Sequence, residues 1–309
     1  MSHESAACRA TMVVPDATAA CSYLENLLGA QPVVEPERAL ALNGGGSLQA
    51  VGLGDMVLEF VEPRGEGGAW SARLDTVGPS VVSLAIDVDD LARARSTLEG
   101  SGISSYVTAE GRVLGDSMSR LGFDVELIAR HPRDTAAGRA GRWGRVSPML
   151  HVEITHDDIS AARSRLARLF GSQPIETQFS DFLMRASGGR MDICHVNLGD
   201  AIVLQYIEPR PEAGPWWTQL AQRGPSVHNI TWLVEDMPAV AAASAAAGTR
   251  DLRYFEFNYD PLFGAENRIG DKTIGRIIDA AAIVGFHIEL SEPQATNIDK
   301  FFFKAMAPY

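Results

Sequence analysis

The sequence consists of two similar halves. Four blocks of the first half recur, in the same order, in the second half. The pairs are VVPDATAACSYLENLLGAQPV at 13–33 with THDDISAARSRLARLFGSQPI at 155–175, EPRGEGGAW at 62–70 with EPRPEAGPW at 208–216, GPSVV at 78–82 with GPSVH at 224–228, and GFDVEL at 122–127 with GFHIEL at 285–290. Four matched blocks in one order make chance similarity implausible, so the chain must be interpreted as a repeat.

Each half divides again into two units of one kind. Residues 9–15 alternate as a strand, residues 16–29 have helical spacing that ends at Gly29, and three short strand-like runs follow. The same order of strand, helix and three strands begins near residues 9, 80, 148 and 225. The sequence therefore predicts four such units.

The domain boundaries follow from the repeat. We expect an N-terminal domain at 1–130, a linker rich in Arg, Gly and Ala at 131–147, a C-terminal domain at 148–292 and an aromatic tail at 293–309. The offset between matched blocks rises by 17, from 146 to 163, between the third and fourth pairs. The second half therefore carries an insertion, which we place at 254–275.

Composition limits the partners of the chain. Lys plus Arg number 27 and Asp plus Glu number 39, so the net charge of −12 disfavours nucleic-acid binding. The three cysteines form no CxxC pair, and no apolar run is long enough for a membrane span. The N-terminus lacks a signal-peptide pattern. We expect a cytoplasmic protein that binds a small-molecule substrate and has neither nucleic acid nor membrane as a partner. The sequence is also compatible with assembly into a homodimer.

Four segments of the second half resemble the vicinal oxygen chelate superfamily. These segments are HVEITHDDIS, HVNLGDAIVLQYIEP, GPSVHNITWLVED and GFHIEL. The superfamily includes glyoxalase I, methylmalonyl-CoA epimerase, bleomycin resistance proteins and type I extradiol dioxygenases. The local match is closest to the epimerase, and the general resemblance covers residues 9–292. It implies an α+β fold in which four βαβββ modules pair into two cup-shaped mixed β-sheet domains with flanking helices.

The resemblance also implies a metal site in the second half. Its ligand positions fall on His151, Gln205, His228 and Glu289. Imidazoles with a carboxylate suit a divalent metal, which we expect to be Fe, Co, Zn, Mn, Ni or Mg. A glutamine within the apolar run IVLQYI also needs a polar reason to be buried. The matching positions of the first half are Arg9, Glu59, Val82 and Glu126, which include no histidine. We therefore expect one metal per chain, in the C-terminal half.

Three reactions are compatible with such a site. The motifs favour a non-redox isomerase, epimerase or lyase, in which Glu176, Asp181 or Glu289 moves a proton at a carbon that the metal acidifies. The two-domain architecture favours an extradiol-type Fe(II) dioxygenase, with His151, His228 and Glu289 as ligands and Gln205 as a bystander. The third hypothesis is a small-molecule binding or resistance protein, against which the complete ligand set argues.

The insertion supplies further candidate residues. Its aromatic side chains either form a hydrophobic substrate wall or pack the loop onto the sheet. The candidates for contact with a small, oxygenated substrate are His287, Tyr254, Phe257, Tyr259 and Arg268. The tail FFFKAMAPY is too apolar to stay in water, so we expect it to pack on its own domain or across a dimer interface.

Overall fold

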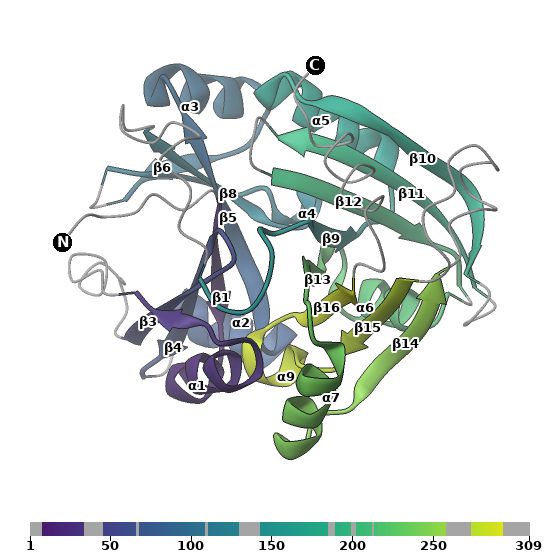
Figure 1. Cartoon of the computed structure of the whole chain (residues 1–309). Helices are drawn as coiled ribbons and strands as arrows, with labels where there is room; N and C mark the ends of the chain where they lie inside the picture. The colour runs from purple at the N-terminus through teal and green to yellow at the C-terminus, as the bar shows by residue number, and fades with distance from the viewer. Residues whose placement is uncertain are drawn as a thin grey trace.

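The structure is a computed structural model. It describes residues 8–33, 46–65, 68–108, 111–129, 143–184, 189–198, 202–211, 213–257 and 273–292 (Figure 1).

The first half contains two units of strand, helix and three strands. Its elements are β1 (Cys8–Val13), α1 (Ala17–Leu28), β2 (Gln31–Pro32), β3 (Gly46–Leu53), β4 (Met56–Pro63), α2 (Ala69–Val77), β5 (Ser80–Val88), α3 (Leu91–Gly100), β6 (Ser105–Val107), β7 (Val113–Gly115), α4 (Met118–Leu121) and β8 (Asp124–Ala129). Here α2 joins the two units, and α4 is a single turn before the last strand.

The second half repeats this order. Its elements are β9 (His151–Thr155), α5 (Ile159–Phe170), β10 (Gln173–Met184), β11 (Gly189–Leu198), β12 (Ile202–Pro209), α6 (Pro215–Arg223), β13 (Ser226–Leu233), α7 (Met237–Ala246), β14 (Asp251–Phe257), β15 (Thr273–Ile278), α9 (Ala281–Val284) and β16 (His287–Glu292). The predicted α+β fold of four βαβββ modules is confirmed.

Each half forms one mixed sheet, and the strand orders correspond position by position. They are β2-β3-β4-β1-β5-β8-β7-β6 in the first half and β10-β11-β12-β9-β13-β16-β15-β14 in the second. In each sheet the first strands of the two modules pair antiparallel at the centre. Each of them also pairs in parallel with the last strand of its own module. The first and last strands of all modules therefore lie together in the middle of their sheet.

An aspartate starts the first helix of every module. The side chains of Asp16, Asp90, Asp158 and Asp236 each accept a hydrogen bond from a backbone N–H in the first helical turn. Such caps satisfy donors that the helix itself leaves free. None of the helices in the described segments is long and apolar enough to cross a membrane.

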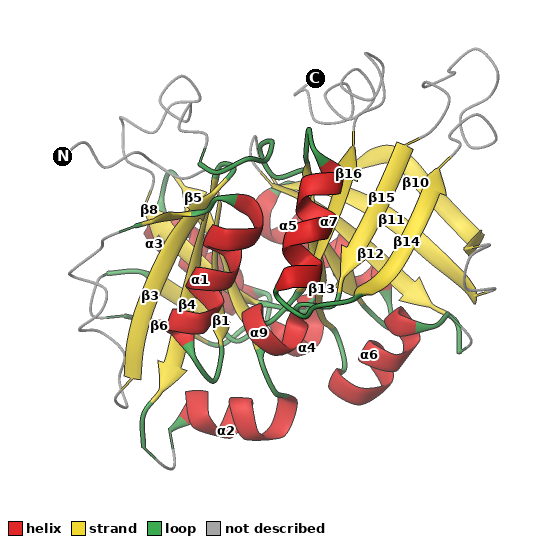
Figure 2. Ribbon diagram, turned by 60° about the horizontal axis from the view of Figure 1, so that its bottom comes forward, coloured by secondary structure: helices red, strands yellow, loops and turns green. Residues whose placement is uncertain are grey.

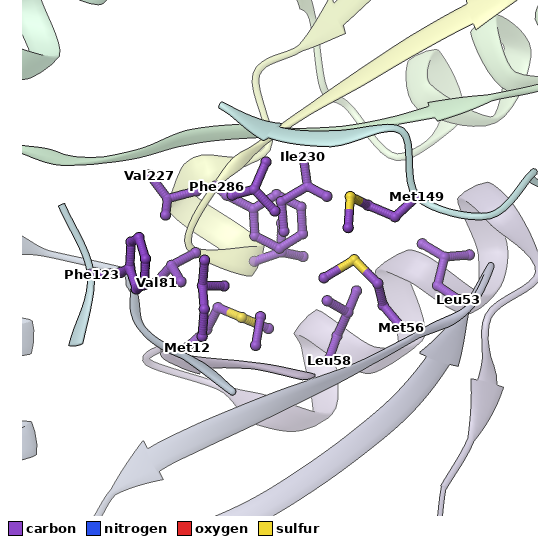
Figure 3. Packing of buried hydrophobic residues seen from close by; sticks show 14 of the residues in the cluster. Met12, Leu53, Met56, Leu58, Val81, Phe123, Met149, Val227, Ile230 and Phe286 are labelled. Atoms are coloured by element: carbon purple, nitrogen blue, oxygen red, sulfur yellow. The ribbon is translucent and has the colours of Figure 1, made fainter. Parts of the chain in front are cut away.

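The apolar faces of the two sheets contribute to one continuous core. Figure 2 shows helices α1, α5, α7 and α9 between the sheets. A single cluster of buried residues includes Met12 and Leu58 from the first sheet together with Ile230 and Phe286 from the second half (Figure 3). Because strand residues alternate between faces, the polar side chains of the central strands lie on the opposite face of each sheet.

The end of the expected linker ties the halves together. Trp143 and Gly54 exchange two backbone hydrogen bonds, of 2.7 and 3.0 Å. The indole ring of Trp143 lies against Gly52 so closely that a β-carbon there would collide with it. A further bridge joins Val146 to Val234. Residues 143–147 thus contact both sheets.

Candidate active site

The central strands of the C-terminal sheet carry a row of polar side chains. Strand pairing places His195 opposite Gln205, Gln205 opposite Glu153, Glu153 opposite Asn229, and Asn229 opposite His287. A second row places His151 opposite Thr231, and Thr231 opposite Glu289. Together with His228, the members of these two rows are called the polar face below. It comprises His151, Glu153, His195, Gln205, His228, Asn229, Thr231, His287 and Glu289.

An irregularity in strand β13 brings His228 to this face. The pairing with β9 shifts between Val227 and Asn229, so His228 is an extra residue in β13. Such a bulge interrupts the alternation of side chains along a strand. His228 Nδ1 and Asn229 Nδ2 consequently both lie 2.8 Å from Oε1 of Glu153. The first half has the same shift opposite Thr11 and Met12, with Val82 as its extra residue.

Glu153 lies at the centre of the polar face and is 3% exposed. Its Oε1 also accepts a hydrogen bond of 2.6 Å from the indole Nε1 of Trp216, on helix α6. The Trp216 ring stacks on the His228 ring, with 5.4 Å between the centroids. A residue from outside the sheet therefore contributes to the site.

Thr231 connects the other predicted ligands. Its hydroxyl lies 2.9 Å from Nε2 of His151 and 3.3 Å from Oε2 of Glu289. Beside this group, Nε2 of Gln205 lies 2.7 Å from Nε2 of His195. The His195 ring meets the His151 ring edge-on, with 6.2 Å between centroids.

Burial shifts the pKa values of the site toward the neutral forms of its side chains. It lowers the pKa of His151 to about 3, with a further contribution from His195. Burial also lowers the pKa of His228 to about 3, and Arg223 adds to this effect. The pKa values of Glu153 and Glu289 are raised, first by burial and, for Glu289, also by the charge of Glu153. Unprotonated imidazoles are the form that binds metals.

The structure brings some predicted site residues together and leaves others apart. His151, His228 and Glu289 lie on three neighbouring central strands, and His287 has its ring 4.9 Å from that of His228. Glu176 and Asp181 belong to edge strand β10, and Tyr254 and Phe257 belong to edge strand β14. For these four residues only the backbone is described, while Tyr259 and Arg268 lie outside the described residues.

The sequence did not reveal five members of the site. They are Glu153, His195, Trp216, Asn229 and Thr231. Alternation in HVEIT does place Glu153 on the face of His151, and EPRPEAGPW does mark the tryptophan. Cys194, the neighbour of His195, points to the opposite face, and burial raises the pKa of its thiol to about 11. A reactive Cys-His pair is therefore disfavoured.

Two observations bear on a metal. Within the described ranges, no three His, Cys, Asp or Glu side chains already converge as a metal site. Nε2 of His228 and Nδ1 of His287, however, are buried and have no hydrogen-bond partner. A buried nitrogen without a partner is costly unless something binds it. The donor types of His151, His228 and Glu289, on three adjacent strands, suit a divalent metal, and the buried Nε2 of His228 is available to bind one.

A family comparison agrees with this location. Residues 150–254 match the family described as the Glyoxalase/Bleomycin resistance protein/Dioxygenase superfamily. The match covers about a third of the chain and lies within its C-terminal half. By sequence, the chain matches none of the curated proteins.

Solved structures share the fold of nearly the whole chain. A variant of 4-hydroxymandelate synthase from Streptomyces coelicolor has a TM-score of 0.69 at 16% identity, covering 99% of this chain and 98% of that one. A halotolerant catechol dioxygenase, BphC, has a TM-score of 0.55 at 10% identity, covering 94% and 86%. A catechol 2,3-dioxygenase has a TM-score of 0.54 at 14% identity, covering 92% and 91%. These likenesses establish the fold, and two of the three names are those of dioxygenases.

Proposed function

We propose that the chain is a metal-dependent dioxygenase of the superfamily that acts on a small, oxygenated aromatic substrate. The observation that carries this proposal is the set of His151, His228 and Glu289 on adjacent central strands. Two neutral imidazoles and one carboxylate are the ligand set of non-haem Fe(II) oxygenases. The dioxygenases of similar fold support this reaction over the isomerase or lyase that the sequence motifs favour.

The metal and the protein have different tasks in this proposal. When bound, Fe(II) supplies the Lewis-acid and redox chemistry that amino-acid side chains lack. His151, His228 and Glu289 hold it on rigid strands, and burial removes competing water.

The remaining polar groups orient the substrate. The Gln205 amide donates to Nε2 of His195, so His195 keeps its proton on Nδ1. His195 can therefore offer a proton at a defined atom, Nδ1. His287 has its unpartnered Nδ1 next to His228 and is proposed to contact the substrate. Tyr254, Phe257, Tyr259 and Arg268 remain proposed substrate contacts from the second half.

A non-redox isomerase, epimerase or lyase is the second candidate. The buried carboxyl groups support it, because a raised carboxyl pKa suits proton transfer near neutral pH. In that reaction Gln205 would be a fourth ligand, and Glu289, Glu176 or Asp181 would move the proton.

Metal analysis separates the two candidates. The full chain is purified without a metal-affinity tag, its metal content is measured, and the anaerobic protein is examined by electron spin resonance with nitric oxide. One Fe(II) per chain that binds nitric oxide supports the dioxygenase. One Co, Zn, Mn, Ni or Mg that is silent to nitric oxide supports acid–base chemistry. A protein that is purified without metal and does not bind added metal contradicts both candidate functions.

A further inference from the structure

Three side chains contact Oε1 of the buried Glu153, and neither of the two candidate reactions requires these contacts. We propose that Glu153 is a positioning residue that fixes His228 as the tautomer protonated at Nδ1, so that the unprotonated Nε2 is presented to the metal. This inference rests on the proposed function, because it assigns Glu153 to the support of a metal ligand.

The hydrogen-bond geometry determines which atom carries the proton. The indole of Trp216 can only donate, and it donates to Oε1 of Glu153. The Asn229 amide has its Nδ2 at 2.8 Å from the same Oε1, and an amide nitrogen can only donate. Oε1 already accepts two hydrogen bonds, so any proton on Glu153 sits on Oε2. The third contact, at 2.8 Å, must then be a hydrogen bond from Nδ1 of His228 to Oε1.

The other nitrogen of His228 shows the consequence. With the proton on Nδ1, Nε2 carries a lone pair and cannot donate. This Nε2 is buried and without a partner among the described residues. A carboxylate behind a histidine commonly selects the tautomer of a metal ligand in this way and raises its basicity.

The surroundings prevent the imidazole from turning over. His228 is 1% exposed, and Trp216, which is 2% exposed, stacks on its ring. A flipped ring would exchange its hydrogen bond to Glu153 for a carbon atom. Such a loss is expensive when the carboxyl oxygen is buried. The sheet and helix α6 therefore hold one orientation.

The first half lacks this arrangement in its central strands. Strand register places Thr11 where the second half has Glu153, Val82 where it has His228, and Ser83 where it has Asn229. The positioning group thus occurs together with the predicted metal ligand and is missing where that ligand is missing.

The first measurement needs no variant. Nitrogen-15 chemical shifts of the metal-free full chain report the tautomer of His228, with His228→Asn used for assignment. We expect a protonated Nδ1 and an unprotonated Nε2. The opposite tautomer, or an even mixture, overturns the proposal.

The second measurement is the affinity for Co(II), added as a probe. Glu153→Ala should weaken binding by about 10- to 100-fold, as is usual for partners of metal ligands. Glu153→Gln keeps an acceptor oxygen and should recover part of this loss. Trp216→Phe keeps an aromatic ring, loses the N–H donor and part of the buried indole surface, and should weaken binding by a few-fold at most. Thr11→Ala, at the corresponding position of the first half, is the control and should bind Co(II) normally.

The results separate this inference from the proposed function. Wild-type protein that takes up neither Fe(II) nor Co(II) overturns both. Wild-type protein that binds metal, with unchanged affinity in Glu153→Ala, overturns only the role of Glu153. If Glu153→Ala does not fold, the nitrogen-15 shifts of His228 in Glu153→Gln and Trp216→Phe still test the role of Glu153. A purely structural role of Glu153 would leave the tautomer of His228 unchanged in these variants.

Discussion

The two halves share a fold, but they satisfy their buried polar groups differently. In the N-terminal sheet, Arg9 pairs with Glu59 at 2.5 Å, and Arg112 pairs with Glu126 at 2.8 Å. In the C-terminal sheet, the register positions of Arg9 and Glu126 hold His151 and Glu289. A carboxylate that is bound to a guanidinium cannot bind a metal without leaving a buried charge unpaired. In the first half, ion pairs thus occupy the two carboxylates, whereas in the second half the histidines have lowered pKa values and stay unprotonated.

The repeated tryptophan shows the same difference. Trp216 is buried and donates to Glu153, whereas Trp70 in the matching block is only partly buried. Helix α6 buries Trp216 and Gln219, while α2 buries none of its residues. The sequence motif is kept in both halves, but its partner carboxylate exists only in the second. We propose that the first half has a structural role.

The largest expected effect is the loss of the metal site. His228→Ala should abolish metal uptake and turnover, because it removes a proposed ligand whose Nε2 is buried and unpartnered. The control Val82→Ala changes the matching bulge residue of the first half and should retain full metal content. Elemental analysis of both purified variants tests this, and stoichiometric metal in His228→Ala would refute the ligand assignment.

The next effect concerns the shared core. Phe123 and Phe286 occupy matching positions, and both belong to the same buried cluster. Phe123→Ala and Phe286→Ala should each cost about 3–5 kcal/mol of unfolding free energy. Because one core joins the sheets, each variant should still unfold in a single transition by calorimetry. Two separate transitions would show that the halves fold independently.

A smaller effect is the acid sensitivity of the metal-free protein. The pKa of His228 is about 3 in the folded chain, against an ordinary 6.5. Between these values the unfolded chain binds a proton that the folded chain does not, so stability falls as pH falls below about 6.5. The slope is at most about 1.4 kcal/mol per pH unit per histidine. His228→Val should therefore flatten the pH dependence measured by urea unfolding with a chelator present; an unchanged slope would contradict this.

The two buried carboxyl groups act in the opposite direction. Glu153 and Glu289 have raised pKa values, so the folded chain retains protons that the unfolded chain releases. Their contribution to stability is lost as pH rises through the raised values. The metal-free protein should accordingly be most stable in mildly acidic solution.

The smallest effect should come from Gln205→Ala. The variant loses the hydrogen bond to His195 and should cost about 1 kcal/mol. Metal content should stay normal if Gln205 only orients His195. Loss of metal in this variant would instead identify Gln205 as a ligand and favour the isomerase or lyase. The control is Gln49→Ala, which removes an exposed hydrogen bond in the first half.

Much of the fold could be predicted from local features of the sequence. The matched blocks gave the number and order of the modules, and the aspartate before each first helix marks its start. His151 and Glu289 were selected because the ligand positions of the superfamily that the chain resembles fall on them. The side chains of Glu176, Asp181 and Tyr254 are not described, so their roles stay predictions.

The sequence by itself determined the repeated fold. Periodicity and matched blocks are enough for the fold, because they depend on neighbours along the chain. The candidate ligand positions, and the lack of histidines at their counterparts in the first half, came from the resemblance to the superfamily. Only the tertiary structure decided that His228 and Asn229 share a face, since the bulge breaks the alternation on which sequence reasoning relies. It also brought Trp216, which is 63 residues away in sequence, to Glu153. Contacts between distant elements depend on how helix α6 packs against the sheet, and no local pattern contains that information.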